Sequence, residues 1–107
     1  MRDYNVFHKM GKDVLLLLVV LQLMKKSGVI PVVVLDDTAK ALTTANALLA
    51  GGVSVMEITF RTAAAADSIK AVSENCPEML VGAGTVVTLD QCKQALECGA
   101  KFIVSPG

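Results

Sequence analysis

The chain has 107 residues, enough for one domain with a hydrophobic core but short for a closed eight-stranded barrel. Apolar residues make up 53% of the sequence and aromatic residues only 4%, which is typical of a parallel sheet covered by helices. Ten acidic and ten basic residues cancel, so the bulk charge indicates neither a nucleic-acid partner nor a membrane surface.

The 28 residues at the N-terminus are the least regular part of the chain. Residues 1–12 are mixed and polar without a clear period, whereas residues 14–21 form an apolar run too short for a membrane span of about twenty residues. A secretory signal remains an alternative, but Lys25 and Lys26 follow at once and no small-residue cleavage site is present. We favour a buried helix that is capped by Asp13 and ends near Gly28.

From residue 29 onward, β-branched runs alternate with helical periods. Strands are predicted near residues 29–35, 53–60, 80–84 and 101–104. The helices between them should be capped by residues 36–38, by Thr62 and by a capping box at Thr88 and Gln91, and should end at Gly51–Gly52, Pro77 and Gly99.

This βα repeat predicts an α/β fold with a parallel sheet and right-handed crossovers. Four βα units are about half of a TIM-type (β/α)8 barrel, so residues 29–107 are expected to form a partial barrel after the N-terminal segment 1–28. The first and fourth predicted strands would then each have an unpaired edge, and we expect the chain to self-associate.

The strand at residues 53–60 carries the most informative polar residues. Alternation places Val53, Val55, Glu57, Thr59 and Arg61 on one face. This face turns polar toward its C-terminal end, which is where α/β barrels and open sheets keep their active sites. The alternative is an ordinary Glu57–Arg61 pair at a solvated strand end.

The three cysteines, Cys76, Cys92 and Cys98, have no CxxC spacing. They favour idle thiols in a reducing compartment, hence a cytoplasmic location, over disulfides or a zinc site. His8 is the only histidine, so a catalytic triad has little support.

Four segments stand in order at natural spacing: residues 28–34, 57–62, 81–86 and 100–107. Together they resemble the N-terminal half of the 2-keto-3-deoxy-6-phosphogluconate (KDPG) and 4-hydroxy-2-oxoglutarate (KHG) aldolase family. The resemblance implies a (β/α)8 barrel with an extra N-terminal helix, assembled as a homotrimer and acting in the Entner–Doudoroff pathway. It also implies a class I aldolase without metal or cofactor, in which a lysine forms a Schiff base with a small keto acid and pyruvate is released.

The resemblance also assigns roles to four residues. Glu57 stands where the family has its general acid/base carboxylate, and Arg61, Thr85 and Pro106 stand where the family contacts substrate. A two-pronged contact would suit Arg61 to the pyruvate carboxylate. The glycines of residues 82–84 either leave room for a ligand or allow close packing inside a barrel, and both interpretations remain open.

The sequence departs from the family pattern in its lysines. The Schiff-base lysine belongs to a later strand; Lys101 begins the fourth strand at the wrong end, and Lys70 and Lys93 are expected on helix exteriors. The segments expected to bind the substrate phosphate are missing too, and residues 1–24 are longer and more apolar than expected.

Three interpretations therefore compete. The chain is a fragment of an aldolase, a half-barrel that self-associates as a structural or binding module, or part of another keto-acid or phosphosugar enzyme of barrel type. None of them identifies the keto acid, and none predicts a nucleic-acid or membrane partner.

Overall fold

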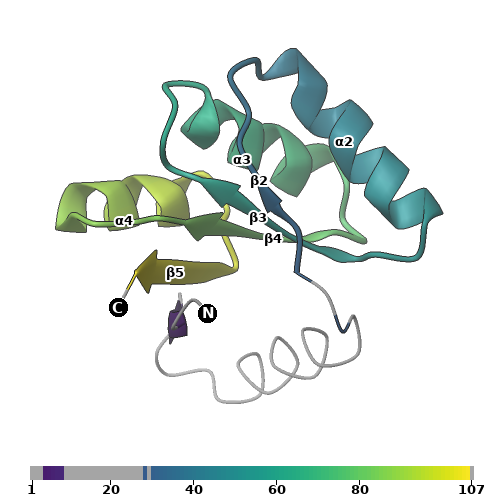
Figure 1. Cartoon of the computed structure of the whole chain (residues 1–107). Coiled ribbons are helices and arrows are strands. Elements are labelled where there is room, and N and C mark those ends of the chain that lie inside the picture. The colour runs from purple at the N-terminus through teal and green to yellow at the C-terminus, as the bar shows by residue number, and fades with distance from the viewer. Residues whose placement is uncertain (1–3, 9–27, 29, 107) are drawn as a thin grey trace.

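A computed structural model describes residues 4–8, 28 and 30–106. Its core is a five-stranded sheet in the order β1-β5-β4-β3-β2 (Figure 1). The elements in chain order are β1 (Tyr4–His8), β2 (Val32–Val33), α2 (Ala39–Ala50), β3 (Val55–Thr59), α3 (Ala65–Asn75), β4 (Leu80–Gly84), α4 (Leu89–Glu97) and β5 (Phe102–Pro106). The predicted apolar helix of residues 13–28 falls almost entirely outside the described residues.

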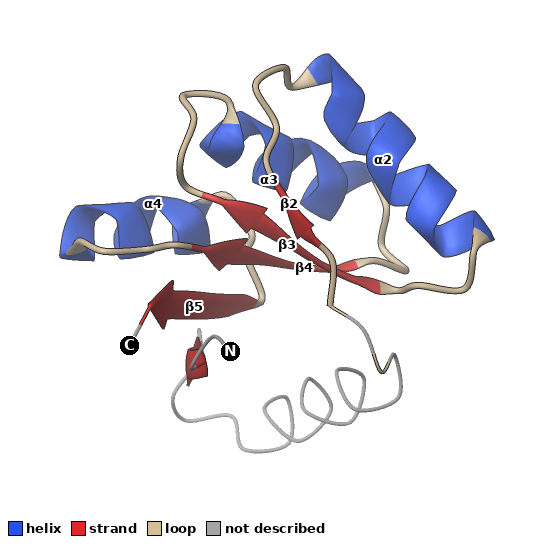
Figure 2. Cartoon of the chain, in the orientation of Figure 1, coloured by secondary structure: helices blue, strands red, loops and turns tan. Residues whose placement is uncertain are grey.

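Strands β2 to β5 are parallel to one another. Helices α2, α3 and α4 connect them and lie on one side of the sheet (Figure 2). The predicted α/β repeat is therefore confirmed. Because parallel strands end at the same edge of a sheet, the C-terminal ends of β3, β4 and β5 lie at one edge.

The observed strands differ in length from the predicted ones. β2 contains only two residues, although the Glu57 N–H also donates to the Pro31 carbonyl at 2.9 Å and continues the pairing. β3 ends at Thr59, so Arg61 lies in a turn rather than in the strand. β5 runs to Pro106, which was expected in the following loop.

The clearest departure from prediction is β1, which lies in a segment that showed no regular pattern. It pairs antiparallel with β5, from Tyr4 opposite Pro106 to His8 opposite Phe102. The expectation of an unpaired edge on the fourth predicted strand, which is β5, is therefore wrong. Among the described strands, β2 is left at the other edge, with β3 as its one neighbour.

The helix N-termini agree with prediction at α2 and α4. At α4 the Gln91 N–H donates to Thr88 Oγ1 at 3.1 Å, which confirms Thr88 as the cap. The Gln91 side chain reaches back one residue further than in a standard capping box, since Gln91 Oε1 accepts from the Val87 N–H at 2.9 Å. At α2, the Ala39 N–H donates to Asp37 Oδ1 at 2.9 Å, while Thr38 makes no side-chain cap.

Thr62, the predicted cap of α3, has a different role. The helix begins at Ala65 without a side-chain cap, and the Thr62 hydroxyl donates to the Leu35 carbonyl instead. This bond ties the turn after β3 to the turn after β2. A long-range partner has replaced the local one, so the prediction of a Thr62 cap is wrong.

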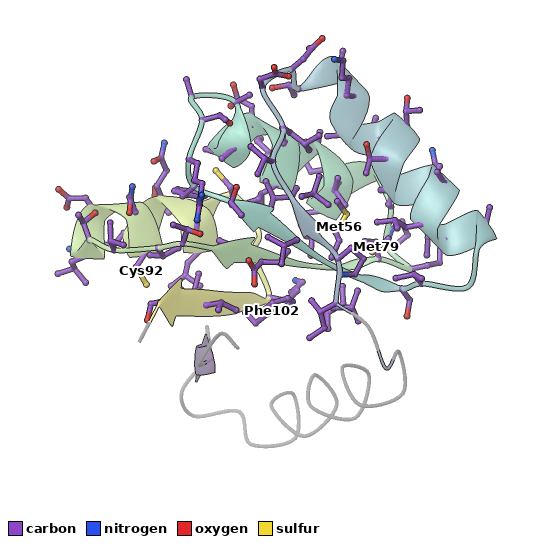
Figure 3. All side chains as sticks on the ribbon, viewed as in Figure 1. Met56, Met79, Cys92 and Phe102 are labelled. Atoms are coloured by element: carbon purple, nitrogen blue, oxygen red, sulfur yellow. The ribbon has the colours of Figure 1, made fainter. Side chains whose placement is uncertain are left out.

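The sheet separates two apolar clusters of unequal size. The larger cluster packs between the sheet and the helices and includes Met56, Ile58 and Met79. The smaller one lies on the opposite side, which we name the inner face, and is built on Val55, Phe102 and Val104, with Ile30 and Leu80 packed against it. Figure 3 labels Phe102 of this cluster. Strand alternation and register place Glu57, Thr59, Gly82 and Gly84 on the inner face as well.

Candidate active site

Glu57 is a buried carboxylate in the middle of β3. Its side chain is 0% exposed, and its backbone lies between Val32 of β2 and Gly82 of β4. Its two strand neighbours on the same face, Val55 and Thr59, are also buried, and Val55 is apolar. Carboxylates are almost never fully buried without a specific reason, so Glu57 is the strongest candidate for chemistry in the described chain.

The carboxylate points toward the C-terminal edge of the sheet. A Cβ placed on Gly84 would lie 1.9 Å from Glu57 Oε2, although Glu57 is in register with Gly82, two residues earlier on β4. The side chain therefore leans diagonally across β4, along the strand direction. At Gly82 the corresponding space is taken by the Phe102 ring, whose nearest atom would lie 2.3 Å from an added Cβ.

These contacts bear on the two interpretations of the glycines. The space directly beside Gly82 and Gly84 is filled by the Phe102 and Glu57 side chains, which favours the close-packing interpretation at these two positions. The sequence carried a signal for this, because two glycines at a spacing of two face the same way as Glu57 on a neighbouring strand.

Thr85 follows Gly84 directly and has a strained backbone. Its φ is +56°, and no other non-glycine residue in the described part of the chain has a positive φ. The Phe60 N–H donates to the Gly84 carbonyl at 2.8 Å, and the Val86 N–H donates to the Val104 carbonyl at 3.3 Å. Hydrogen bonds on both sides thus hold Thr85 at the end of β4, and such strain concentrates at functional sites.

Arg61 and Pro106 complete the predicted set at the same edge. Arg61 is an exposed turn residue two positions after the end of β3, and Pro106 is the last residue of β5. Glu57, Thr85, Arg61 and Pro106 thus come from three neighbouring parallel strands or the turns after them. The alternative of a solvated Glu57–Arg61 pair does not fit, because Glu57 is buried away from solvent.

The lysines of the described segments lie away from this edge. Lys40, Lys70 and Lys93 are exposed on α2, α3 and α4, and Lys101 is exposed just before β5, at the opposite end of that strand. None of these four lysines is therefore placed to form a Schiff base beside Glu57.

The cysteines take no part in the site. All three are free thiols. Burial raises the pKa of the Cys98 thiol above its ordinary value, and the Asp67 carboxylate raises it further, against a smaller opposing effect of Lys70. Cys98 therefore stays protonated and unreactive near neutral pH.

The described residues lack two other kinds of feature. These residues contain no cluster of three or more His, Cys, Asp or Glu side chains that could hold a metal ion. Across the same residues, no helix is long and apolar enough to cross a membrane.

Sequence comparison identifies relatives of the chain. The family model for KDPG and KHG aldolase matches residues 20–107. The chain is 44% identical over 91 residues to the 2-dehydro-3-deoxy-phosphogluconate aldolase of Treponema pallidum, covering 85% of this chain and 43% of that protein. It is 47% identical over 79 residues to the KHG/KDPG aldolase of Escherichia coli K12, covering 74% of this chain and 37% of that protein.

Solved structures of aldolases also resemble the chain. The 2-keto-3-deoxy-6-phosphogluconate aldolase of Zymomonas mobilis ATCC 29191 superposes with a TM-score of 0.76 at 44% identity, covering 80% of this chain and 41% of that one. The Legionella pneumophila KDPG aldolase, with pyruvate captured as a covalent carbinolamine, gives a TM-score of 0.73 at 43% identity, covering 76% and 39%.

The chain thus spans about two fifths of the length of these relatives, with 43% and 41% of the Treponema and Zymomonas proteins covered. Its parallel strands and helices form part of a TIM-type α/β barrel fold. Sequence and structure together show that the chain belongs to the KDPG and KHG aldolase family.

Proposed function

We propose that the protein carrying this chain is a class I aldolase. It cleaves a 2-keto-3-deoxy-6-phosphosugar acid or 4-hydroxy-2-oxoglutarate to pyruvate and an aldehyde. The observation that carries the proposal is the fully buried Glu57 carboxylate, which is directed at the edge where Thr85 follows β4. The names of the relatives and the covalent pyruvate in the Legionella structure support the same chemistry.

In this proposal Glu57 moves the proton. As the carbon–carbon bond breaks, the carboxylate accepts the proton of the substrate hydroxyl whose carbon becomes the aldehyde carbonyl. The bonding electron pair passes to the iminium and leaves an enamine, and Glu57 then returns a proton to the enamine carbon. A positioned general acid/base of this kind contributes about 10²- to 10⁴-fold to rate.

The other three residues bind substrate in this proposal. The Arg61 guanidinium holds the pyruvate carboxylate through two parallel hydrogen bonds. Thr85 and Pro106 contact the substrate from the ends of β4 and β5. The amine that forms the iminium comes from outside the described residues, because the four described lysines are remote from this edge.

The first test replaces the proposed acid/base. In an enzyme that carries this chain, Glu57→Gln should lower kcat by about 10²- to 10⁴-fold while pyruvate is still trapped by borohydride. The matched control is Glu74→Gln, at an exposed position near the end of α3, which should leave kcat unchanged. Unchanged turnover in the Glu57 variant would remove the residue from the mechanism.

The second test concerns the lysines. Incubation of the 107-residue chain with pyruvate and borohydride should leave no stoichiometric adduct on Lys40, Lys70, Lys93 or Lys101, and this chain alone should show no aldolase turnover. Peptide mass spectrometry measures both the extent and the site of trapping. A full equivalent on one of these four lysines contradicts the proposed division of roles.

A second candidate function is a non-catalytic half-barrel that self-associates. The observation that favours it is β1, which occupies the edge of β5 where a parallel barrel would add its next strand. Assembly as a homotrimer and a cytoplasmic location remain part of the aldolase proposal. An aldolase assay on the protein carrying this chain separates the two candidates: the aldolase proposal predicts turnover there, and the half-barrel module predicts none.

A further inference from the structure

Gly84 and the Glu57 carboxyl group share one space on the inner face. A Cβ on Gly84 would lie 1.9 Å from Oε2, 2.3 Å from Cδ and 2.6 Å from Cγ of Glu57. Carbon atoms that are not bonded make their closest favourable contacts at about 3.5 Å, so three successive atoms of the acid would collide with any side chain at position 84.

Glu57 has little freedom to avoid such a collision. Its N–H donates to the Pro31 carbonyl, and its backbone is paired on both sides within the sheet. The space directly opposite, beside Gly82, is filled by the Phe102 ring, which is 1% exposed. The side chain is therefore blocked toward the N-terminal end of β4 and open toward the C-terminal end.

We propose that Gly84 is a positioning residue for Glu57. By lacking a side chain, it forms the slot that directs the carboxylate to the C-terminal edge of the sheet, one residue before Thr85. Gly82 has a different partner, since it accommodates Phe102 of the apolar cluster. The inference rests on the proposed function, in which Glu57 carries the proton.

The activity test asks which second substitution, at Glu57 or at Phe102, relieves the defect of each glycine variant in an enzyme that carries this chain. Gly84→Ala should lower kcat by about 10- to 100-fold with a smaller change in KM, since a misplacement of about 1 Å can cost 10²-fold. Glu57→Asp withdraws the carboxylate by one methylene, so adding it to Gly84→Ala should reduce activity by less than the product of the two single effects.

Gly82→Ala is the matched control, with the same substitution on the same face of the same strand. Its defect should be relieved by Phe102→Leu and not by Glu57→Asp, because the added methyl group meets the ring. Gly84→Ala should show the reverse pattern. Rescue of both glycine variants by the same partner, or of neither, overturns the proposal.

The same single and double variants can be compared without an activity assay, by thermal unfolding of the 107-residue chain. Each glycine variant should lower Tm by about 5–15 °C, the range expected for an overpacked site in a domain of this size. Glu57→Asp should restore part of the loss in Gly84→Ala only. If Gly84→Ala alone does not fold, its double variants with Glu57→Asp and with Phe102→Leu are compared, and equal Tm values overturn the proposal.

These outcomes separate the two claims. Rescue in Tm, together with wild-type kcat in Gly84→Ala and a large loss of kcat in Glu57→Gln, overturns the positioning role alone. Wild-type kcat in Glu57→Gln removes the proton-transfer role of Glu57, and the positioning role of Gly84 with it, while the aldolase activity itself stands. Rescue in both Tm and kcat, with an inactive Glu57→Gln variant, supports both.

Discussion

Thr85 bears the most unusual backbone of any described residue. A left-handed conformation costs a residue with a Cβ about 1–2 kcal/mol, and a β-branched side chain makes it less favourable still. At φ +56°, Thr85 keeps this conformation because the backbone is hydrogen-bonded immediately before and after it. The strain is local to the edge to which Glu57 points.

Relief of this strain should stabilise the fold. Asn tolerates the left-handed region better than Thr, so Thr85→Asn should raise the free energy of unfolding by about 0.5–1 kcal/mol and lower aldolase activity in an enzyme that carries the chain. Urea unfolding measures the first effect and kcat/KM the second.

The control is Thr43→Asn, at an exposed position within α2, where the two residues have similar helix propensity and stability should hardly change. Equal stability changes in the two variants would show that the backbone of Thr85 stores no recoverable strain.

At the scale of single residues, the sequence predicted some features of the site and not others. Glu57 stood out because a carboxylate inside an apolar strand is chemically conspicuous. Arg61 was expected beside it by alternation, but β3 ends at Thr59 and alternation no longer applies in the turn. The slot at Gly84 required the diagonal contact between two strands, which no single-strand pattern contains.

At the scale of elements, local signals predicted well and long-range ones did not. The Thr88 cap of α4 lies within four consecutive residues from Thr88 to Gln91 and was predicted from the sequence. Thr62 looked equally suited to cap α3, but it bonds to Leu35, 27 positions earlier in the chain. Likewise, β1 pairs with a strand at the other end of the described chain, so its pairing has no local pattern.

Removal of the α4 cap should have a defined cost. Thr88→Ala deletes the acceptor of the Gln91 N–H and should destabilise the chain by about 1 kcal/mol. This corresponds to a loss of about 4–8 °C in Tm for a domain of this size, which calorimetry can measure.

Thr43→Ala serves as the control for this variant, since it removes an exposed threonine inside α2, where alanine is the better helix former. A loss of Tm as large in Thr43→Ala would attribute the effect to something other than the cap.

Within the described residues the two faces of the sheet differ, with a large apolar cluster on the helix side and a small one on the inner face. The helix side holds most of the buried apolar residues, whereas the inner cluster is built on Val55, Phe102 and Val104. The edge strand β2 adds exposed apolar surface, with Val32 45% and the following Val34 58% exposed. Exposed β-branched residues at a sheet edge favour pairing between chains.

We therefore expect the 107-residue chain to self-associate at micromolar concentration. Val34→Lys should increase the monomer fraction, because a charge at the edge opposes strand pairing. Val87→Lys is the matched control: Val87 is 66% exposed but lies beyond the sheet, after β4. Size-exclusion chromatography with light scattering measures both, and a sharp monomer peak for the unaltered chain contradicts the expectation.

The β1–β5 ladder also bears on the order in which the molecule folds. Each βα unit can form from neighbouring residues, but the pairing of Tyr4 with Pro106 closes a loop of about one hundred residues. Contacts so distant along the chain form slowly, because loop-closure entropy is lost before the contact can compensate for it. During synthesis β1 emerges first, yet its partner strand emerges last among the described elements. The earliest strand is therefore the one whose docking completes the sheet.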